Sequence, residues 1–170
     1  GYSDTIGSNN VFIGYQSGHE NNDGTNNLFL GYQSGKDLVD GSGNTILGNN
    51  AGVNATGGND NIFIGPLAGR YQTSGDNNIY LGRSAGTGLD GTTSNEGTEN
   101  IFIGTNAGER NATGHNNIYI GNSSGRNSTN ADYNIFIGNS SGLSGTTGQY
   151  NTFLGFEAGY SNQNGGDNVY

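Results

Sequence analysis

The sequence predicts an all-β protein, a parallel β-solenoid of about ten 17-residue coils. Two observations lead to this fold class. A segment of the form Asn-apolar-apolar-apolar-Gly recurs every 17 residues, and glycine returns at three fixed positions of the period. With 34 Gly among 170 residues and a hydrophobic content of 29%, the chain cannot fill a conventional globular core. Such a composition usually indicates disorder, but a disordered chain does not keep a register.

The repeat is in phase along the whole chain, so we expect a single array over residues 1–170. Its starting asparagines are Asn10, Asn27, Asn44, Asn61, Asn78, Asn100, Asn117, Asn134, Asn151 and Asn168. Every step is 17 residues except the step from Asn78 to Asn100, which is 22. Five residues are therefore inserted within 87–96, and we expect them to form a loop that leaves the stack of coils intact.

Each position at which the same type of residue recurs in the 17-residue period has a structural interpretation. A repeat of 17 residues is too short for a pair of helices, which needs about 33 or more. The apolar triplet therefore fits a short β-strand, which would stack about 4.8 Å from its copies in the next coils. Glycines supply the corners with positive φ, and they oppose helix formation. The asparagine row should form a ladder of amides between coils. A Ser or Ala always precedes the second glycine, as at Ser17 and Ala51, which indicates a tight inward corner.

The apolar triplets carry apolar side chains on both faces, because successive strand residues point to opposite sides. If the first and third residues fill the interior, the middle residues face outward as one aromatic row. That row is Phe12, Phe29, Ile46, Phe63, Tyr80, Phe102, Tyr119, Phe136, Phe153 and Tyr170. So long an apolar row exceeds what a soluble monomer exposes, so we expect it to be an oligomer interface, at the axis of a homotrimer. The opposite assignment exposes still more apolar area and leads to the same need for a cover.

The unit Asn-Ile-Phe-Ile-Gly-x-x-Ala-Gly at residues 100–108 carries a resemblance to known repeats. It resembles the head repeats of trimeric autotransporter adhesins (YadA-like heads) and is similar to repeat arrays of phage tail-fibre proteins. The adhesin repeats are shorter and have Ala in the middle of the strand, where this chain has Phe or Tyr. The resemblance implies a left-handed β-roll that assembles as a homotrimer.

Composition excludes several classes of function. A net charge of −9, from 14 acidic and 5 basic residues, leaves no basic surface for nucleic acid. There is no cysteine, hence no disulfide and no thiolate site. The apolar runs are three residues long, so this segment should not insert into a membrane.

The chain lacks a starting Met and begins and stops inside a coil. We expect the repeat to continue beyond both ends, or copies to stack end to end as a filament.

Nothing in the sequence points to catalysis. His19 and His115 occupy different phases of the repeat, and the acidic residues match no calcium-binding pattern. We therefore expect a non-enzymatic protein without cofactor or metal. The main hypothesis is a structural rod segment of an extracellular, cell-surface or virion fibre, whose partner is the chain itself.

Two further functions remain open. The first is adhesion to a glycan or protein receptor, with stacking platforms at Tyr15, Tyr32, Tyr71, Phe156 and Tyr160. The second is ice binding, for which the nearest row, running through Thr56, Thr73 and Thr129, is interrupted by Val39, Ala112 and Gln163. Separately, three Asn-x-Thr matches are candidate attachment sites for N-linked glycans: Asn54, Asn111 and Asn127.

Overall fold

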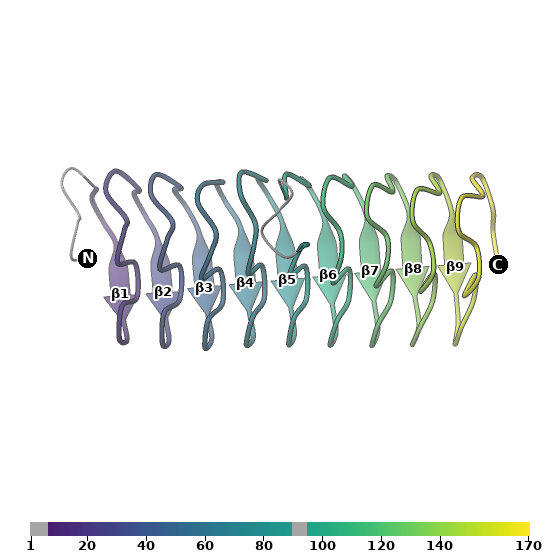
Figure 1. Ribbon diagram of the computed structural model, residues 1–170, viewed down its shortest axis with the longest axis horizontal. Helices are drawn as coiled ribbons and strands as arrows, with labels where there is room; N and C mark the ends of the chain where they lie inside the picture. Colours follow the sequence, from purple (N-terminus) through teal and green to yellow (C-terminus); the bar gives the residue numbers. More distant parts are fainter. Residues whose placement is uncertain (1–6, 90–94) are drawn as a thin grey trace.

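The structure, a computed structural model that describes residues 7–89 and 95–170, is a parallel β-solenoid (Figure 1). Each coil contributes one three-residue strand, and the nine strands form one parallel sheet in sequence order. They are β1 Val11–Ile13, β2 Leu28–Leu30, β3 Thr45–Leu47, β4 Ile62–Ile64, β5 Ile79–Leu81, β6 Ile101–Ile103, β7 Ile118–Ile120, β8 Ile135–Ile137 and β9 Thr152–Leu154. A bridge between Thr152 and Val169 continues the pairing. The described residues contain no helix, so the predicted all-β solenoid is confirmed.

The strands pair in the register that the period predicts. Phe12 lies opposite Phe29, and each later pair repeats this 17-residue step except the pair across the insertion. Across the insertion, Ile79 pairs with Ile101, and the backbone N–H of Asn100 donates to Asn78 Oδ1 at 3.0 Å. The inserted residues therefore leave the stack intact, as expected. Residues 90–94, the middle of the insertion, lie outside the described part.

The asparagine row forms a hydrogen-bonded ladder along the solenoid. The Oδ1 of each asparagine accepts from the backbone N–H of the asparagine one coil further on, as between Asn10 and Asn27 at 2.9 Å. The Nδ2 donates to a carbonyl of the loop, as from Asn44 to the Gly58 oxygen at 2.9 Å. From Asn61 onward, neighbouring side-chain amides also bond to each other. The row thus satisfies buried polar groups that would otherwise cost about 1 to 3 kcal/mol each.

The middle residue of each strand points into the solenoid, so the outward direction expected for the aromatic row is wrong. Its buried members are Phe29, Ile46, Phe63, Tyr80, Phe102, Tyr119, Phe136 and Phe153. Phe12 is partly buried against this core, and Tyr170, in the last coil, is 61% exposed. The eight buried side chains are covered by their own chain, so they cannot form a trimer interface.

The physical reason is the shape of the interior. Neighbouring rings of the row stack in parallel, 4.8 Å apart between Phe102 and Tyr119 and 5.0 Å between Tyr80 and Phe102. This is the spacing of the strands themselves, so one flat ring per coil fills the slot. Behind each ring lies the second glycine of the coil: a Cβ on Gly18 would lie 2.7 Å from the Phe12 ring. The Ser/Ala row is buried as well, from Ser17 to Ser141, and Ala158 in the last coil is partly buried.

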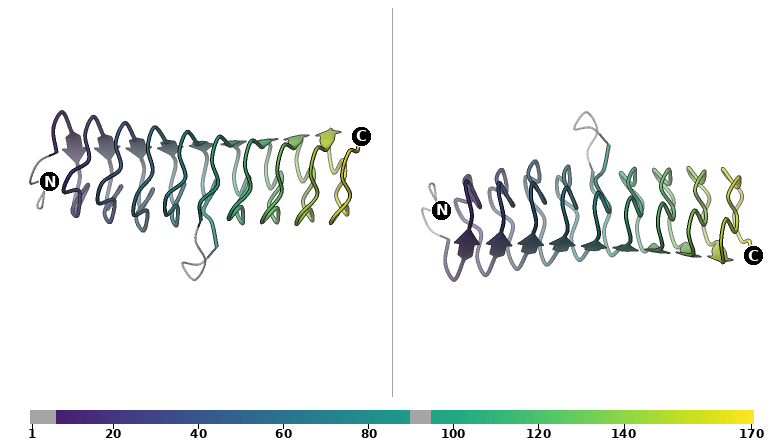
Figure 2. Two further views of the ribbon diagram at one scale, coloured as in Figure 1. Left: turned by 90° about the horizontal axis from the view of Figure 1, so that it is seen from above. Right: turned by 90° about the horizontal axis from the view of Figure 1, so that it is seen from below.

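The sheet forms one side of the rod, and the loops form the others (Figure 2). Strands β1 and β9 lie at opposite ends of the rod (Figure 1). In the described residues, no helix is long and apolar enough to cross a membrane. Because the loops lie on the other sides, the outer face of the sheet is a long, narrow surface that other molecules can reach.

Candidate functional site

The outer face of the sheet carries a continuous row of aliphatic side chains, which we call the aliphatic strip. It consists of the first and third residues of strands β1 to β9, all of them Ile, Leu or Val except Thr45 and Thr152. They point outward because the middle residue of each strand points inward, and strand residues alternate between faces. In every strand both flanking residues are exposed or half-buried, while the middle residue is more buried.

The strip exposes aliphatic side chains along the length of the sheet. Seven of its residues are exposed, from 36% at Ile64 to 68% at Leu154. They lie in β1, β2, β4, β8 and β9, and half-buried members of the strip lie between them. A continuous apolar surface of this kind is typical of a site that binds another molecule.

The backbone beside the strip lets neighbouring coils approach closely. The glycine after each strand has a positive φ, such as 140° at Gly31 and 141° at Gly48. A Cβ on Gly31 would lie 2.5 Å from the Gly48 carbonyl oxygen, so the coils approach too closely there for any side chain. On the other edge, the asparagine ladder turns inward. Exposed tyrosines stand beyond these two edges in four of the coils, at Tyr15, Tyr32, Tyr133 and Tyr150.

The aromatic residues proposed as stacking platforms do not form one site. Tyr15 and Tyr32 stack on each other with centroids 5.4 Å apart, and both are exposed. Tyr71 lies elsewhere, with the Arg70 guanidinium 4.8 Å from its ring centroid. Phe156 and Tyr160 are exposed near the C-terminal end.

Sequence reasoning missed a second exposed pair, Tyr133 and Tyr150, which stack 5.2 Å apart at φ values of 56° and 58°. Left-handed backbone is unusual for so large a residue. The signal available in the sequence is that Tyr stands here at a corner where other coils have Asn, Asp, Glu or Gly.

The three candidate glycan attachment sites differ in access. Asn111 is only 4% exposed and points into the interior, so its amide cannot receive a glycan in the folded chain. Asn127 is half-buried, and Asn54 is exposed. The prediction for Asn111 is therefore corrected, because its position in the coil is one of the inward-facing rows.

The threonines considered for ice binding use their hydroxyls to bond to the backbone of the next coil. The Thr56 hydroxyl donates to the Thr73 carbonyl oxygen at 3.1 Å, and the Thr129 hydroxyl donates to the Thr146 carbonyl oxygen at 3.2 Å. An ice-binding array needs hydroxyls directed at water in an unbroken row. This row has interruptions, and its hydroxyls already bond to the next coil.

The titratable groups do not assemble into a reactive cluster. His19 Nδ1 is 2.7 Å from Glu20 Oε1, whereas His115 Nδ1 is 2.9 Å from the Thr98 hydroxyl, several coils away. Among the described residues there is no group of three His, Cys, Asp or Glu that could hold a metal ion. Burial raises the pKa of the Tyr80 and Tyr119 hydroxyls far above the ordinary value for tyrosine. Both therefore stay neutral inside the core.

No protein-family model, curated protein or solved structure matches this chain. What the site can do must consequently be argued from its geometry. The feature that stands out is the aliphatic strip, a long apolar surface suited to binding another apolar surface.

Proposed function

We propose that the chain is a structural rod segment of an extracellular, cell-surface or virion fibre, in which copies of the solenoid pack together through the aliphatic strip. The observation that carries this proposal is the strip itself, which runs the length of the sheet from β1 to β9. Nearly all of the other regular positions propagate the coil, as the asparagine ladder and the ring stack do. A rod in which every coil repeats the same stabilising contacts is suited to spanning a distance.

The partner that fits the strip best is a second copy of the chain. The two rows of aliphatic side chains have the same spacing in every coil, so two strips laid along each other remain complementary over their whole length. Burial of apolar area stabilises such contact by about 25 cal/mol per Å² before the costs of association are subtracted. The resemblance to trimeric adhesin heads would make the roll left-handed and the assembly a homotrimer with the three strips at its axis.

The assembly can be tested by multi-angle light scattering on the chain and on the double variant Ile64→Lys/Ile135→Lys. Both side chains are outward and partly exposed, at 36% and 39%, so the solenoid should fold with lysines there. The parent chain should have the mass of three copies, and the variant should have the mass of one, because two buried charges per chain would be left unpaired.

The matched control is Ser74→Lys/Gln163→Lys, which adds the same charge at two exposed loop positions away from the strip. It should keep the mass of the parent. A monomeric parent chain, or an equal loss of assembly in both double variants, would refute the proposal. Circular dichroism of each variant verifies that the β-solenoid is retained.

A further inference from the structure

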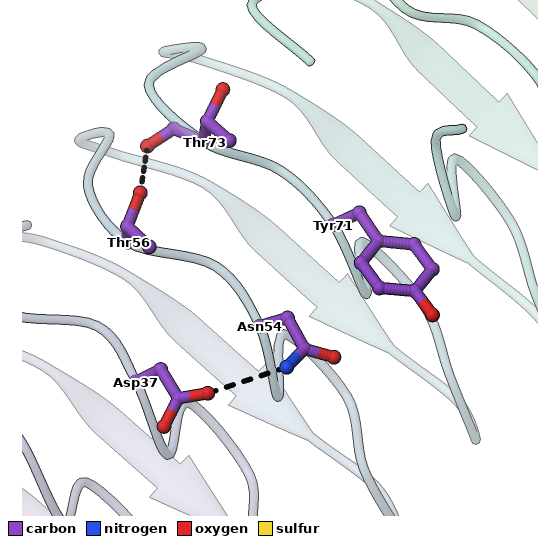
Figure 3. Close-up of a pocket in the computed structure, with 5 residues that line it drawn as sticks. All are labelled: Asp37, Asn54, Thr56, Tyr71 and Thr73. Carbon is purple, nitrogen blue, oxygen red and sulfur yellow. Dashed lines mark hydrogen bonds between the residues drawn. The ribbon is translucent and has the colours of Figure 1, made fainter. Parts of the chain in front are cut away.

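A half-open pocket of about 300 Å³ lies in the loops that follow β2, β3 and β4 (Figure 3). Its lining residues are Asp37, Asn54, Thr56, Tyr71 and Thr73. Asp37, Asn54 and Tyr71 hold the same position in three successive coils, 17 residues apart, and the two threonines form the neighbouring row. The solenoid therefore presents these groups as a grid.

This combination occurs once along the chain. At the equivalent position, the preceding coil has Glu20, the following one has Gly88, and the later ones have Arg110, Asn127 and Ser144. Only the coils after β2 to β4 place a carboxylate, an amide and an aromatic ring on consecutive steps. Gly88 leaves the end of the row beside Tyr71 without a side chain.

The scaffold fixes the pocket's groups before any ligand arrives. The backbone N–H of Asn54 donates to the Arg70 carbonyl, and that of Tyr71 donates to the Thr87 carbonyl, both at 2.9 Å. Asn54 Nδ2 also donates to Asp37 Oδ2 at 3.3 Å, which sets the two planar side chains beside each other (Figure 3). Groups held in place in this way lose little conformational freedom on binding.

The chemistry of the lining indicates a ring that bears hydroxyls on its rim and C–H groups on its faces. A carboxylate and an amide side by side offer several acceptors and a donor, which suits adjacent hydroxyls. Tyr71 offers an apolar ring with a polar tip, and the Arg70 guanidinium lies 4.8 Å from its centroid. The volume is at the lower end for small-molecule sites, enough for one or two sugar rings.

We propose that this pocket binds a neutral saccharide, with Tyr71 as the stacking platform and Asp37 and Asn54 as the hydrogen-bonding groups. Lys36 Nζ lies 2.7 Å from Asp37 Oδ1, so the carboxylate of the pocket is already paired with a cation. The net charge of −9 on the whole chain opposes an anionic ligand. The pocket lies in the loops, whereas the aliphatic strip lies on the sheet. Saccharide binding is therefore independent of self-association, and Ile64→Lys/Ile135→Lys should leave it unchanged. A glycan attached to Asn54 would fill the same pocket, so unmodified protein is the material to test.

The test is a titration of the protein with four neutral disaccharides, maltose, cellobiose, lactose and chitobiose, and with a sulfated disaccharide, followed by NMR. At least one neutral disaccharide should bind saturably with a Kd on the order of 1 mM. Tyr71→Ala and Asp37→Ala should each weaken that binding by about tenfold or more, because each removes one of the two kinds of contact. The control Tyr15→Ala removes a more exposed tyrosine that does not line the pocket, and it should leave the Kd within about twofold.

Three results would overturn the proposal. The first is that no neutral disaccharide binds at about 20 mM, where the expected affinity gives near-complete occupancy. The second is that Tyr71→Ala leaves the binding unchanged. The third is that only the sulfated disaccharide binds. Should Tyr71→Ala lose its β circular dichroism, Asn54→Ala decides in its place, since Asn54 is exposed and its removal leaves the core untouched.

Discussion

Replacing Phe102 by Ala should destabilise the solenoid strongly, whereas replacing the adjacent Ile103 should not. Phe102 is 0% exposed, and its ring lies between those of Tyr80 and Tyr119, at 5.0 and 4.8 Å. Its removal opens a cavity in the middle of the ring stack. A Phe→Ala change in a core costs about 3 to 5 kcal/mol, and loss of two stacking contacts places this site in the upper half of that range.

The assay is thermal unfolding of Phe102→Ala and Ile103→Ala, both made in the Ile64→Lys/Ile135→Lys background so that self-association does not contribute. For a chain of this size, about 4 kcal/mol corresponds to a fall of roughly 10 °C in Tm. Ile103 faces outward in the same strand, so its truncation in the monomer should change stability by about 0.5 kcal/mol or less. Equal losses for the two variants, or a larger loss for Ile103→Ala, would refute the inward assignment of the aromatic row.

Three further outcomes follow from the structure. Asn117→Ala should cost about 2 to 4 kcal/mol in chemical denaturation, because the buried side chain makes hydrogen bonds to the coils on both sides and its loss leaves their partners unsatisfied. Gly35→Ala should lower Tm more than Gly52→Ala: both have φ near 55°, but the new Cβ would lie 2.7 Å from the Phe29 ring at Gly35 and 3.1 Å from an isoleucine methyl at Gly52. Stability should fall above about pH 10, because the unfolded chain then ionises Tyr80 and Tyr119 while burial keeps the folded ones protonated. A Tyr80→Phe/Tyr119→Phe variant, followed by Tm from pH 8 to 11, should lose most of this dependence.

The fold could be predicted from the sequence because the period alone determines which residues pair. A 17-residue step that resumes after a 22-residue one leaves Ile79 no partner but Ile101, and the structure has this pair. The asparagine row could be assigned a ladder for a similar reason. An amide repeated at every coil has another amide within reach on each side.

Hydrophobicity could not predict which residues of each strand point into the solenoid, because all three positions of the triplet are apolar. The deciding property is shape. The interior is a slot as deep as one ring, backed by a glycine such as Gly108, and a flat Phe or Tyr fills it where a pair of branched aliphatic side chains would not. A usable signal was present, since the glycine six residues after each aromatic position leaves space for a ring. This glycine has two roles: it forms a corner of the coil, and it lies behind the ring.

The loop pocket was beyond the reach of sequence reasoning for a different reason. Asp37, Asn54 and Tyr71 come into a row only through the stacking of coils, and the sequence around each of them does not show that a hollow lies beside the row. Once the register is known, such rows can be read down the columns of the repeat. Tyr71 was recognised as a candidate platform, but its neighbours on the adjacent coils supply the polar half of the site.

The most direct test of the account is a cryo-electron microscopy map of the assembled native material, sectioned across the rod. The account expects several solenoids in each section, with the outer faces of their sheets turned to one another, and the rings of Phe63 and Phe102 enclosed within each single chain. A section with one isolated solenoid whose sheet faces solvent, or with solenoids in contact through their loops, would contradict it.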